Sequence, residues 1–154
     1  MENKDTRTFK INPEIGMKKV QFMNRYGITL AGDLYLPKNY ENKKNPSVIV
    51  AGPFGAVKEQ ASGLYAQELA ARGFASIAFG PSFGGKSGGE VRNTASPDTF
   101  TEDYSAAVDY IGLLPYVDRE RIGAVGICGL SGMALLHWAI MKLLLMGIMG
   151  RLQE

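Results

Sequence analysis

Three short apolar segments, each followed by a stretch with helical character, constrain the fold of this chain more than any other feature. The segments lack the polar alternation of half-exposed strands, which is typical of strands buried on both faces. They are predicted over residues 47–51, 74–79 and 122–127, and helices are predicted over 58–72, from 97 onward and from 131 onward. Strands that alternate with helices form parallel sheets with right-handed crossovers. The sequence therefore predicts an α/β fold with a mostly parallel sheet.

Two partly alternating segments precede this pattern. Residues 18–23 and 28–36 are separated by Asn24-Arg25-Tyr26-Gly27, which predicts an N-terminal β-hairpin. A chain of 154 residues has room for one core. We expect residues 1–16 to be a loosely ordered lead-in and residues 17–154 to form a single domain.

Composition excludes several classes of protein. The net charge is only +2 and the sequence has no basic run, so we expect no nucleic-acid partner. The polar amino terminus has no signal sequence, which predicts a cytoplasmic protein. Residues 133–149 are apolar but contain Lys142, which favours a buried core helix over a membrane span. No motif calls for a cofactor or a metal ion.

The single cysteine lies where a predicted strand meets a predicted helix, in Gly126-Ile127-Cys128-Gly129. A sharp strand-to-helix turn presents a nucleophile over the sheet, and the start of a helix is where thiols are activated. Glycines flank such a turn because the backbone is crowded there. The pattern predicts Cys128 as the nucleophile of a nucleophile elbow; the alternative is an inert cysteine at a strand end. Ser131 is predicted to lie inside the helix, as a helix-start hydroxyl.

The loop after the first buried strand could complete an oxyanion hole. In sites with a nucleophile elbow, one N–H comes from the residue after the nucleophile, here Gly129, and one from this loop, here Phe54 or Gly55. The alternative is a plain glycine turn into a helix. Glu59 is predicted to be an exposed glutamate of a first helical turn; the alternative is that this carboxylate, the one of the loop that could do so, approaches the thiol.

A second glycine-rich loop matches the phosphate-binding pattern GxxxxGK[ST] over residues 80–87. A phosphate-binding loop needs a helix that begins at Lys86 and Ser87, whereas Gly88 and Gly89 follow. We therefore favour a solvated loop, with nucleotide binding through Lys86 as an alternative.

The sole histidine, His137, lies nine residues after Cys128 along the same predicted helix, too far for a hydrogen bond with the thiol. It is predicted to be a packed or surface residue. The carboxylates of the preceding helix are predicted to be first-turn or solvent-facing charges. These are Asp98, Glu102, Asp103 and Asp109.

Taken together, residues 17 to about 135 resemble the N-terminal half of α/β-hydrolases of the dienelactone-hydrolase-like group. The matching segments are GAVKEQ (55–60), RGFASIAF (72–79), SGGE (87–90), SPD (96–98), TEDYSAAVD (101–109), VDRERIG (117–123) and GICG (126–129). The resemblance implies a cofactor-independent hydrolase that acts through Cys128 on a small ester or lactone.

The resemblance also implies an acid and a histidine after the nucleophile, and Glu154 precedes any such pair. We therefore expect a truncated hydrolase domain with half of an active site. The alternative is a non-catalytic, self-associating protein. In either case the strand that ends near Cys128 would lie at or near a sheet edge, which predicts a homo-oligomer.

Overall fold

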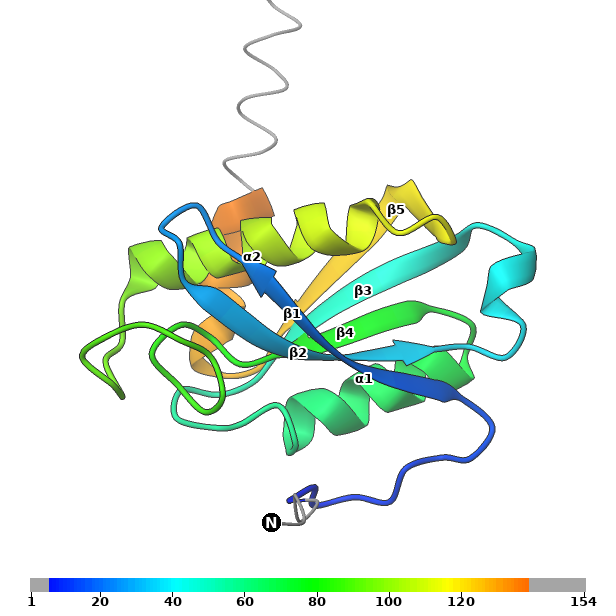
Figure 1. Cartoon of the computed structure of the whole chain (residues 1–154), viewed down its shortest axis with the longest axis horizontal. Coiled ribbons are helices and arrows are strands. Elements are labelled where there is room, and N and C mark those ends of the chain that lie inside the picture. Colours follow the sequence, from blue (N-terminus) through cyan, green and yellow to red (C-terminus); the bar gives the residue numbers. More distant parts are fainter. Residues whose placement is uncertain (1–5, 139–154) are drawn as a thin grey trace, which may run out of the picture.

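A five-stranded mixed sheet forms the centre of the molecule, with helices on both of its faces (Figure 1). The structure is a computed structural model that describes residues 6–138. Its strands are β1 (Gly16–Met23), β2 (Thr29–Leu36), β3 (Asn45–Ala51), β4 (Ala75–Phe79) and β5 (Val117–Gly126). Its helices are α1 (Ala61–Ala71), α2 (Pro97–Gly112), the short 3-10 helix η1 (Tyr40–Asn42), and a helix from residue 129 to the last described residue, 138.

The strand order is β1-β2-β4-β3-β5. The hairpin strands β1 and β2 pair antiparallel, and β2 pairs antiparallel with β4. Strand β3 pairs parallel with both β4 and β5. The predicted hairpin and parallel β-α-β units are confirmed. Within residues 6–138, β5 is an edge strand of this sheet, as expected.

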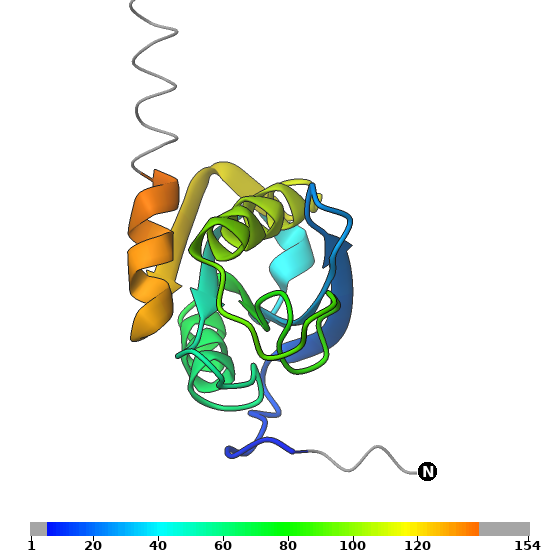
Figure 2. The same cartoon turned by 90° about the vertical axis from the view of Figure 1, so that its left-hand side faces the viewer.

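The two faces of the sheet bury two separate sets of side chains. Helix α1 covers one face, where Val48 and Val50 of β3 pack near Ala66. Helix α2 and the helix from residue 129 cover the other face, where Ile49 packs near Tyr104 and Leu130 (Figure 2). Successive residues of β3 therefore point into opposite cores, which explains why its sequence is apolar throughout rather than alternating.

Local signals in the sequence mark the start of α2 and the end of α1, whereas α1 begins at Ala61 and the last helix at residue 129 rather than at the predicted 58 and 131. Ser96 caps α2 by accepting a hydrogen bond from the Thr99 N–H at 3.4 Å, and Pro97 occupies the first turn. Gly73, with φ of +96°, follows the end of α1. Strand β5 begins five residues earlier than predicted. The prediction missed its first half because the residues around Arg119 are polar and exposed, and so lack the apolar pattern of a buried strand.

Between residues 6 and 15 the lead-in has neither helix nor strand, yet it is held against α1 and the turn before it. The side-chain amide of Gln67 donates to the Lys10 carbonyl oxygen at 3.1 Å and accepts from the Asn12 N–H at 2.9 Å. The Thr8 N–H also donates to the Glu59 carbonyl oxygen at 3.1 Å. Most of the predicted apolar tail helix, 133–149, lies outside the described residues. None of the helices described between residues 6 and 138 is long and apolar enough to span a membrane.

Candidate active site

Cys128 occupies a strained turn between β5 and the helix that starts at residue 129. Its φ is +57°, a left-handed conformation that residues with a side chain seldom adopt. Cys128 is also exposed to solvent. The Ser131 N–H donates to the Cys128 carbonyl oxygen at 3.1 Å, and the Ser131 hydroxyl donates to the same oxygen. Ser131 therefore stabilises the turn from inside the helix.

The two glycines around Cys128 are required by close packing. A Cβ on Gly126 would meet the Ser131 Cα and the carbonyl group of Leu130, and a Cβ on Gly129 would run into the Phe54 ring. The backbone crowding that the sequence predicts for this turn therefore comes from Leu130 and Ser131 at Gly126, and from the Phe54 ring at Gly129. Gly126 allows β5 to pass beneath the first helical turn, and Gly129 allows Phe54 to lie against the backbone next to Cys128.

The loop after β3 lies beside this turn, in agreement with the predicted order of the site. The Ile127 N–H donates to the Ala51 carbonyl oxygen at 3.0 Å, which joins the end of β5 to the end of β3. Gly55 has φ of +74° in the tight turn that follows. Because Gly129 is the first helical residue, its N–H has no acceptor within the helix. Gly129 and Phe54 lie together; the roles of Gly129, Phe54 and Gly55 as oxyanion donors stay a prediction.

Glu59 is a buried partner of lysines, and the expectation of an exposed first-turn glutamate is wrong. It precedes α1, its side chain is 6% exposed, and it accepts from Lys58 at 2.8 Å and Lys86 at 3.0 Å. Burial opposes its ionisation, but these two hydrogen bonds, the positive charge of Lys58 and a backbone hydrogen bond together outweigh burial and lower the pKa of Glu59 to about 2. Lys58 also pairs with the buried Asp33 at 3.0 Å. These contacts give Glu59 a structural role, with its carboxylate bound by Lys58 and Lys86.

The glycine-rich loop lacks the geometry of a nucleotide-binding loop. No helix begins at Lys86 or Ser87, and α2 starts only at Pro97. The Ser87 hydroxyl is buried, where it donates to the Gly80 carbonyl oxygen at 2.7 Å and accepts from the Ala31 N–H at 3.0 Å. A phosphate ligand of this motif would need the Ser87 hydroxyl and the Lys86 ammonium group, and both already bind other groups of the protein. The loop is also less solvated than predicted.

Asp103 departs most clearly from its sequence-based prediction, because it is buried rather than solvent-facing. Its carboxylate accepts from the Ser82 N–H at 2.7 Å, the Ser82 hydroxyl at 2.8 Å and the Asn24 side-chain amide at 2.8 Å. Burial raises the pKa of Asp103 despite these bonds. Asp103 thereby ties α2 to the hairpin turn and to the start of the glycine-rich loop.

His137 is packed into the protein, as predicted. Its Nδ1 lies 2.9 Å from the Ser105 hydroxyl of α2, and burial lowers the pKa of His137. Across residues 6–138, no hydrogen bond joins the Cys128 thiol to a histidine or carboxylate. The same part of the chain contains no group of three or more His, Cys, Asp or Glu side chains that could hold a metal ion.

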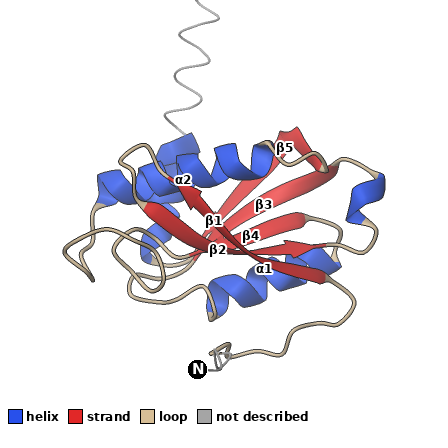
Figure 3. Ribbon diagram, viewed as in Figure 1, coloured by secondary structure: helices blue, strands red, loops and turns tan. Residues whose placement is uncertain are grey.

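A cavity of about 140 Å³ lies between the loop after β3 and the glycine-rich loop. Both loops project from the carboxyl ends of the parallel strands, together with the start of α2 (Figure 3). The rings of Phe54 and Phe100 have centroids 5.8 Å apart at this cavity, and Phe83 contributes a third ring. Sequence reasoning missed Phe83 and Phe100 as site residues, because only the fold brings the glycine-rich loop and the start of α2 to the loop that contains Phe54.

Comparison with known proteins places this geometry in a family. The chain is 60% identical to the uncharacterized protein PA2218 of Pseudomonas aeruginosa over 136 residues, which cover 88% of this chain and 37% of the relative. The crystal structure of that protein matches with a TM-score of 0.88, over 92% of this chain and 44% of the other.

Two further proteins are more distant. The chain is 32% identical to the thiohydrolase aneE of Aspergillus aculeatus over 118 residues, 77% of this chain and 36% of the relative. The α/β-hydrolase GrgF from a Penicillium species matches with a TM-score of 0.67 and 26% identity, over 73% of this chain and 38% of the other. The chain spans little more than a third of the length of the curated relatives it matches.

The α/β-hydrolase fold expected from the sequence is confirmed, whereas the dienelactone-hydrolase-like subgroup stays a prediction. Residues 26–143 match the X-Pro dipeptidyl-peptidase (S15) family, and this segment includes both loops of the site and the elbow. The chain therefore belongs to the X-Pro dipeptidyl-peptidase (S15) family of α/β-hydrolase fold proteins.

Proposed function

We propose that this chain provides the nucleophile and the oxyanion-binding half of an acyl-transfer site, with Cys128 as the nucleophile. The substrate class is an ester, lactone or thioester; the thioester is suggested by the thiohydrolase relative. One observation supports the proposal above all others. Cys128 is exposed with φ of +57° directly after β5, beside Gly129 and the loop that contains Phe54.

The chemistry follows from this arrangement. The Cys128 thiolate attacks the carbonyl carbon, a C–S bond forms, and the carbonyl oxygen becomes an oxyanion. The N–H of Gly129 and an N–H of Phe54 or Gly55 would stabilise that oxyanion. Collapse of the intermediate expels the alkoxide or thiolate, which takes a proton from water, and leaves an acyl-cysteine thioester that water can hydrolyse.

The described residues favour the first of these two steps. No general base contacts Cys128 between residues 6 and 138, so nothing in that part of the chain activates water for release of the acyl group. We therefore expect rapid formation of one acyl-enzyme per chain, followed by slow turnover. The matched residues make up little more than a third of the relatives, so the activity of those proteins can depend on residues that have no counterpart here.

The test is a single-turnover reaction of the 154-residue chain with p-nitrophenyl acetate. We expect a burst of one p-nitrophenolate per chain, and a mass increase of one acetyl group on the peptide that contains Cys128. Cys128→Ala should abolish both signals, and Cys128→Ser should retain the fold with a much slower burst. An equal burst in Cys128→Ala would refute the proposal.

We also propose that the chain self-associates, because β5 is an edge strand within the described part of the sheet. The residues of β5 from Ile122 to Gly126 are only partly buried. One side of β5 pairs parallel with β3, and its other side has no paired strand among residues 6–138. Light scattering across a concentration series would detect dimers. A mass that stays monomeric up to high micromolar concentration would contradict this second proposal.

A further inference from the structure

We infer that the cavity lined by Phe54, the residue packed against Gly129, binds the acyl part of the substrate and selects neutral acyl groups of about the size of a benzoyl group. The inference rests on the proposed function, because an acyl pocket has meaning only where acyl transfer occurs. It adds the class of group that the site accepts.

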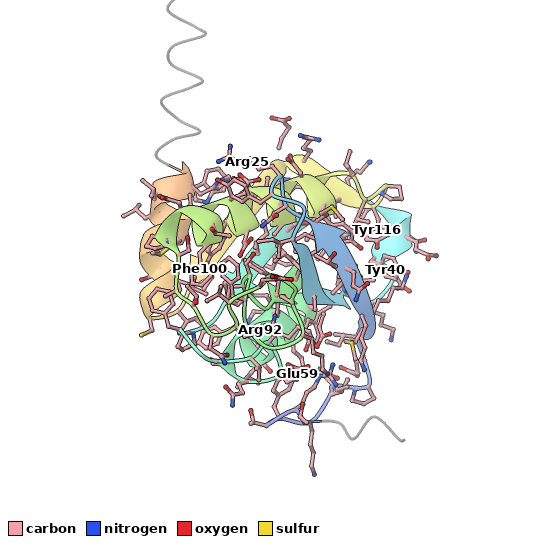
Figure 4. The ribbon with its side chains drawn as sticks, turned by 60° about the vertical axis from the view of Figure 1, so that its left-hand side comes forward. Arg25, Tyr40, Glu59, Arg92, Phe100 and Tyr116 are labelled. Carbon is pink, nitrogen blue, oxygen red and sulfur yellow. The ribbon has the colours of Figure 1, made fainter. Side chains whose placement is uncertain are left out.

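The position of the cavity supports an acyl pocket. Phe54 forms one wall of it and also lies against Gly129, the residue after the nucleophile. Pro81 and Phe83 of the glycine-rich loop and Phe100 of α2 line the same cavity. Phe100, labelled in Figure 4, belongs to the same buried cluster as Leu130 of the helix that starts at residue 129. A carbonyl held at Gly129 would therefore direct its substituent along Phe54.

The lining of the cavity indicates a neutral group. Three aromatic rings are joined by small or uncharged residues, and no lining residue carries a charge. The lining residues are Phe54, Gly55, Ala56, Pro81, Ser82, Phe83, Gly84, Gly85, Asn93, Thr94, Ala95 and Phe100. The Ser82 hydroxyl is occupied by Asp103 at 2.8 Å. The neighbouring cation, Lys86, pairs with Glu59 at 3.0 Å. An acyl group with its own carboxylate would find no counter-charge in this lining, and its burial would be costly.

The volume of the cavity indicates the size of the group. The cavity measures about 140 Å³. An apolar protein cavity of roughly 150 Å³ accommodates benzene. A phenyl ring or a chain of about six carbons would therefore fill the space, whereas an acetyl group would leave most of it empty. A chain of about ten carbons would extend past the rim.

The walls are held in place, so the size of the pocket can discriminate between ligands. The Phe83 N–H donates to the Gly88 carbonyl oxygen at 2.8 Å, and the Asn93 N–H donates to the Phe83 carbonyl oxygen at 2.9 Å. Arg92 donates to the Gly85 carbonyl oxygen at 2.7 Å and also to that of Ser87. These bonds close the loop on itself, with Phe83 at its centre.

Two reagent series test the inference on the 154-residue chain, each normalised to the rate with glutathione. The first series acylates Cys128 with p-nitrophenyl acetate, hexanoate, decanoate and benzoate. The second alkylates Cys128 with iodoacetamide and with its N-butyl, N-phenyl and N-octyl derivatives, which requires no acyl transfer. We expect benzoate and hexanoate to react on the order of tenfold faster than acetate, with a decline at decanoate, and a parallel preference for N-phenyl and N-butyl reagents.

Ala95→Trp fills the cavity from an exposed position and should reduce the benzoyl-to-acetyl ratio to about one. Ala71→Trp, at the exposed end of α1 outside this lining, is the matched control and should leave the ratio unchanged. A flat size preference in both series, or a preference that Ala95→Trp leaves intact, would overturn the inference. Alkylation with the expected preference but without any acylation would instead reject the proposed function and retain a pocket for neutral groups.

Discussion

The two ends of the parallel strands differ in how their loops are held. At the amino ends, the buried Asn45 donates to three carbonyl oxygens, those of Tyr40, Lys43 and Tyr116, at 2.7 to 3.0 Å. The rings of Tyr40 and Tyr116 pack edge to face nearby, and Figure 4 shows both on the far side of the molecule from Phe100. At this end a single side-chain amide holds three carbonyl oxygens, and Asn39 is the one non-glycine residue of the described chain there with a positive φ.

The carboxyl ends instead concentrate backbone strain. Five non-glycine residues of the described chain have positive φ, and four of them, Phe83, Val91, Asn93 and Cys128, lie at this end. Such conformations cost energy and persist where the surrounding structure enforces them, which is common at functional sites. By this comparison, the amino ends stabilise the fold, and the carboxyl ends hold side chains such as Cys128 and Phe83 in strained positions at the candidate site. The following variants test this difference between the two ends.

The largest effect is expected from Gly126→Ala. The new Cβ would lie within 2.5 Å of the Leu130 carbonyl oxygen, so the backbone of the elbow must move. We expect the free energy of unfolding, measured with urea, to fall by about 3 kcal/mol. The matched control is Gly123→Ala in the same strand, where the nearest atom, the Ser47 carbonyl oxygen, is 3.9 Å away. Equal losses for the two variants would contradict the crowding of the elbow.

At the opposite end, Asn45→Ala should destabilise the protein without affecting the site. It leaves three carbonyl oxygens without their shared donor, which should lower the free energy of unfolding by about 2 kcal/mol. Acylation of Cys128 should be unchanged under conditions where the variant is fully folded. A loss of acylation in the folded variant would show that the two ends are coupled.

Acid should weaken the ion pairs beneath the site through Glu59. Because the pKa of Glu59 in the folded protein is lowered to about 2, its contribution is fully present above the unfolded value of about 4.3 and is lost as pH falls toward 2. We expect the difference in unfolding free energy between wild type and Glu59→Gln to shrink by roughly 2 kcal/mol between pH 5.5 and 2.5. The raised pKa of Asp103 acts in the opposite direction but is common to both proteins, so it cancels in the difference. A difference that is independent of pH would contradict the assignment.

The smallest effects compare strained positions at the two ends. Val91 is exposed with φ of +62°, which a β-branched residue tolerates poorly, whereas Asn39 has φ of +56° and asparagine tolerates that region. Val91→Asn should raise the free energy of unfolding by about 0.5 to 1 kcal/mol, and Asn39→Val should lower it by a similar amount. Changes of the same sign in both variants would contradict the account of strain.

The sequence predicts the frame of this protein well, because the frame depends on local patterns. Apolar strands, the Ser96 cap and the turn at Cys128 each follow from a few adjacent residues. Asp103, Glu59 and Asn45 are different, since their burial depends on partners 21 to 79 residues away. A carboxylate on a helix or loop has the same local sequence whether it faces water or a buried serine. The aromatic wall from Phe83 and Phe100 was missed for the same reason.

The most direct test of the account compares acylation of the folded and unfolded chain. Cys128 is the only cysteine in the sequence, so the incorporation of acetyl groups from p-nitrophenyl acetate reports on one thiol. The rate is measured in buffer and in urea that unfolds the chain, each relative to glutathione in the same solution. If the elbow places Cys128 beside oxyanion donors, the folded chain should react at least about tenfold faster than the unfolded chain. An equal or slower rate in the folded chain would contradict the claim that this turn presents a nucleophile.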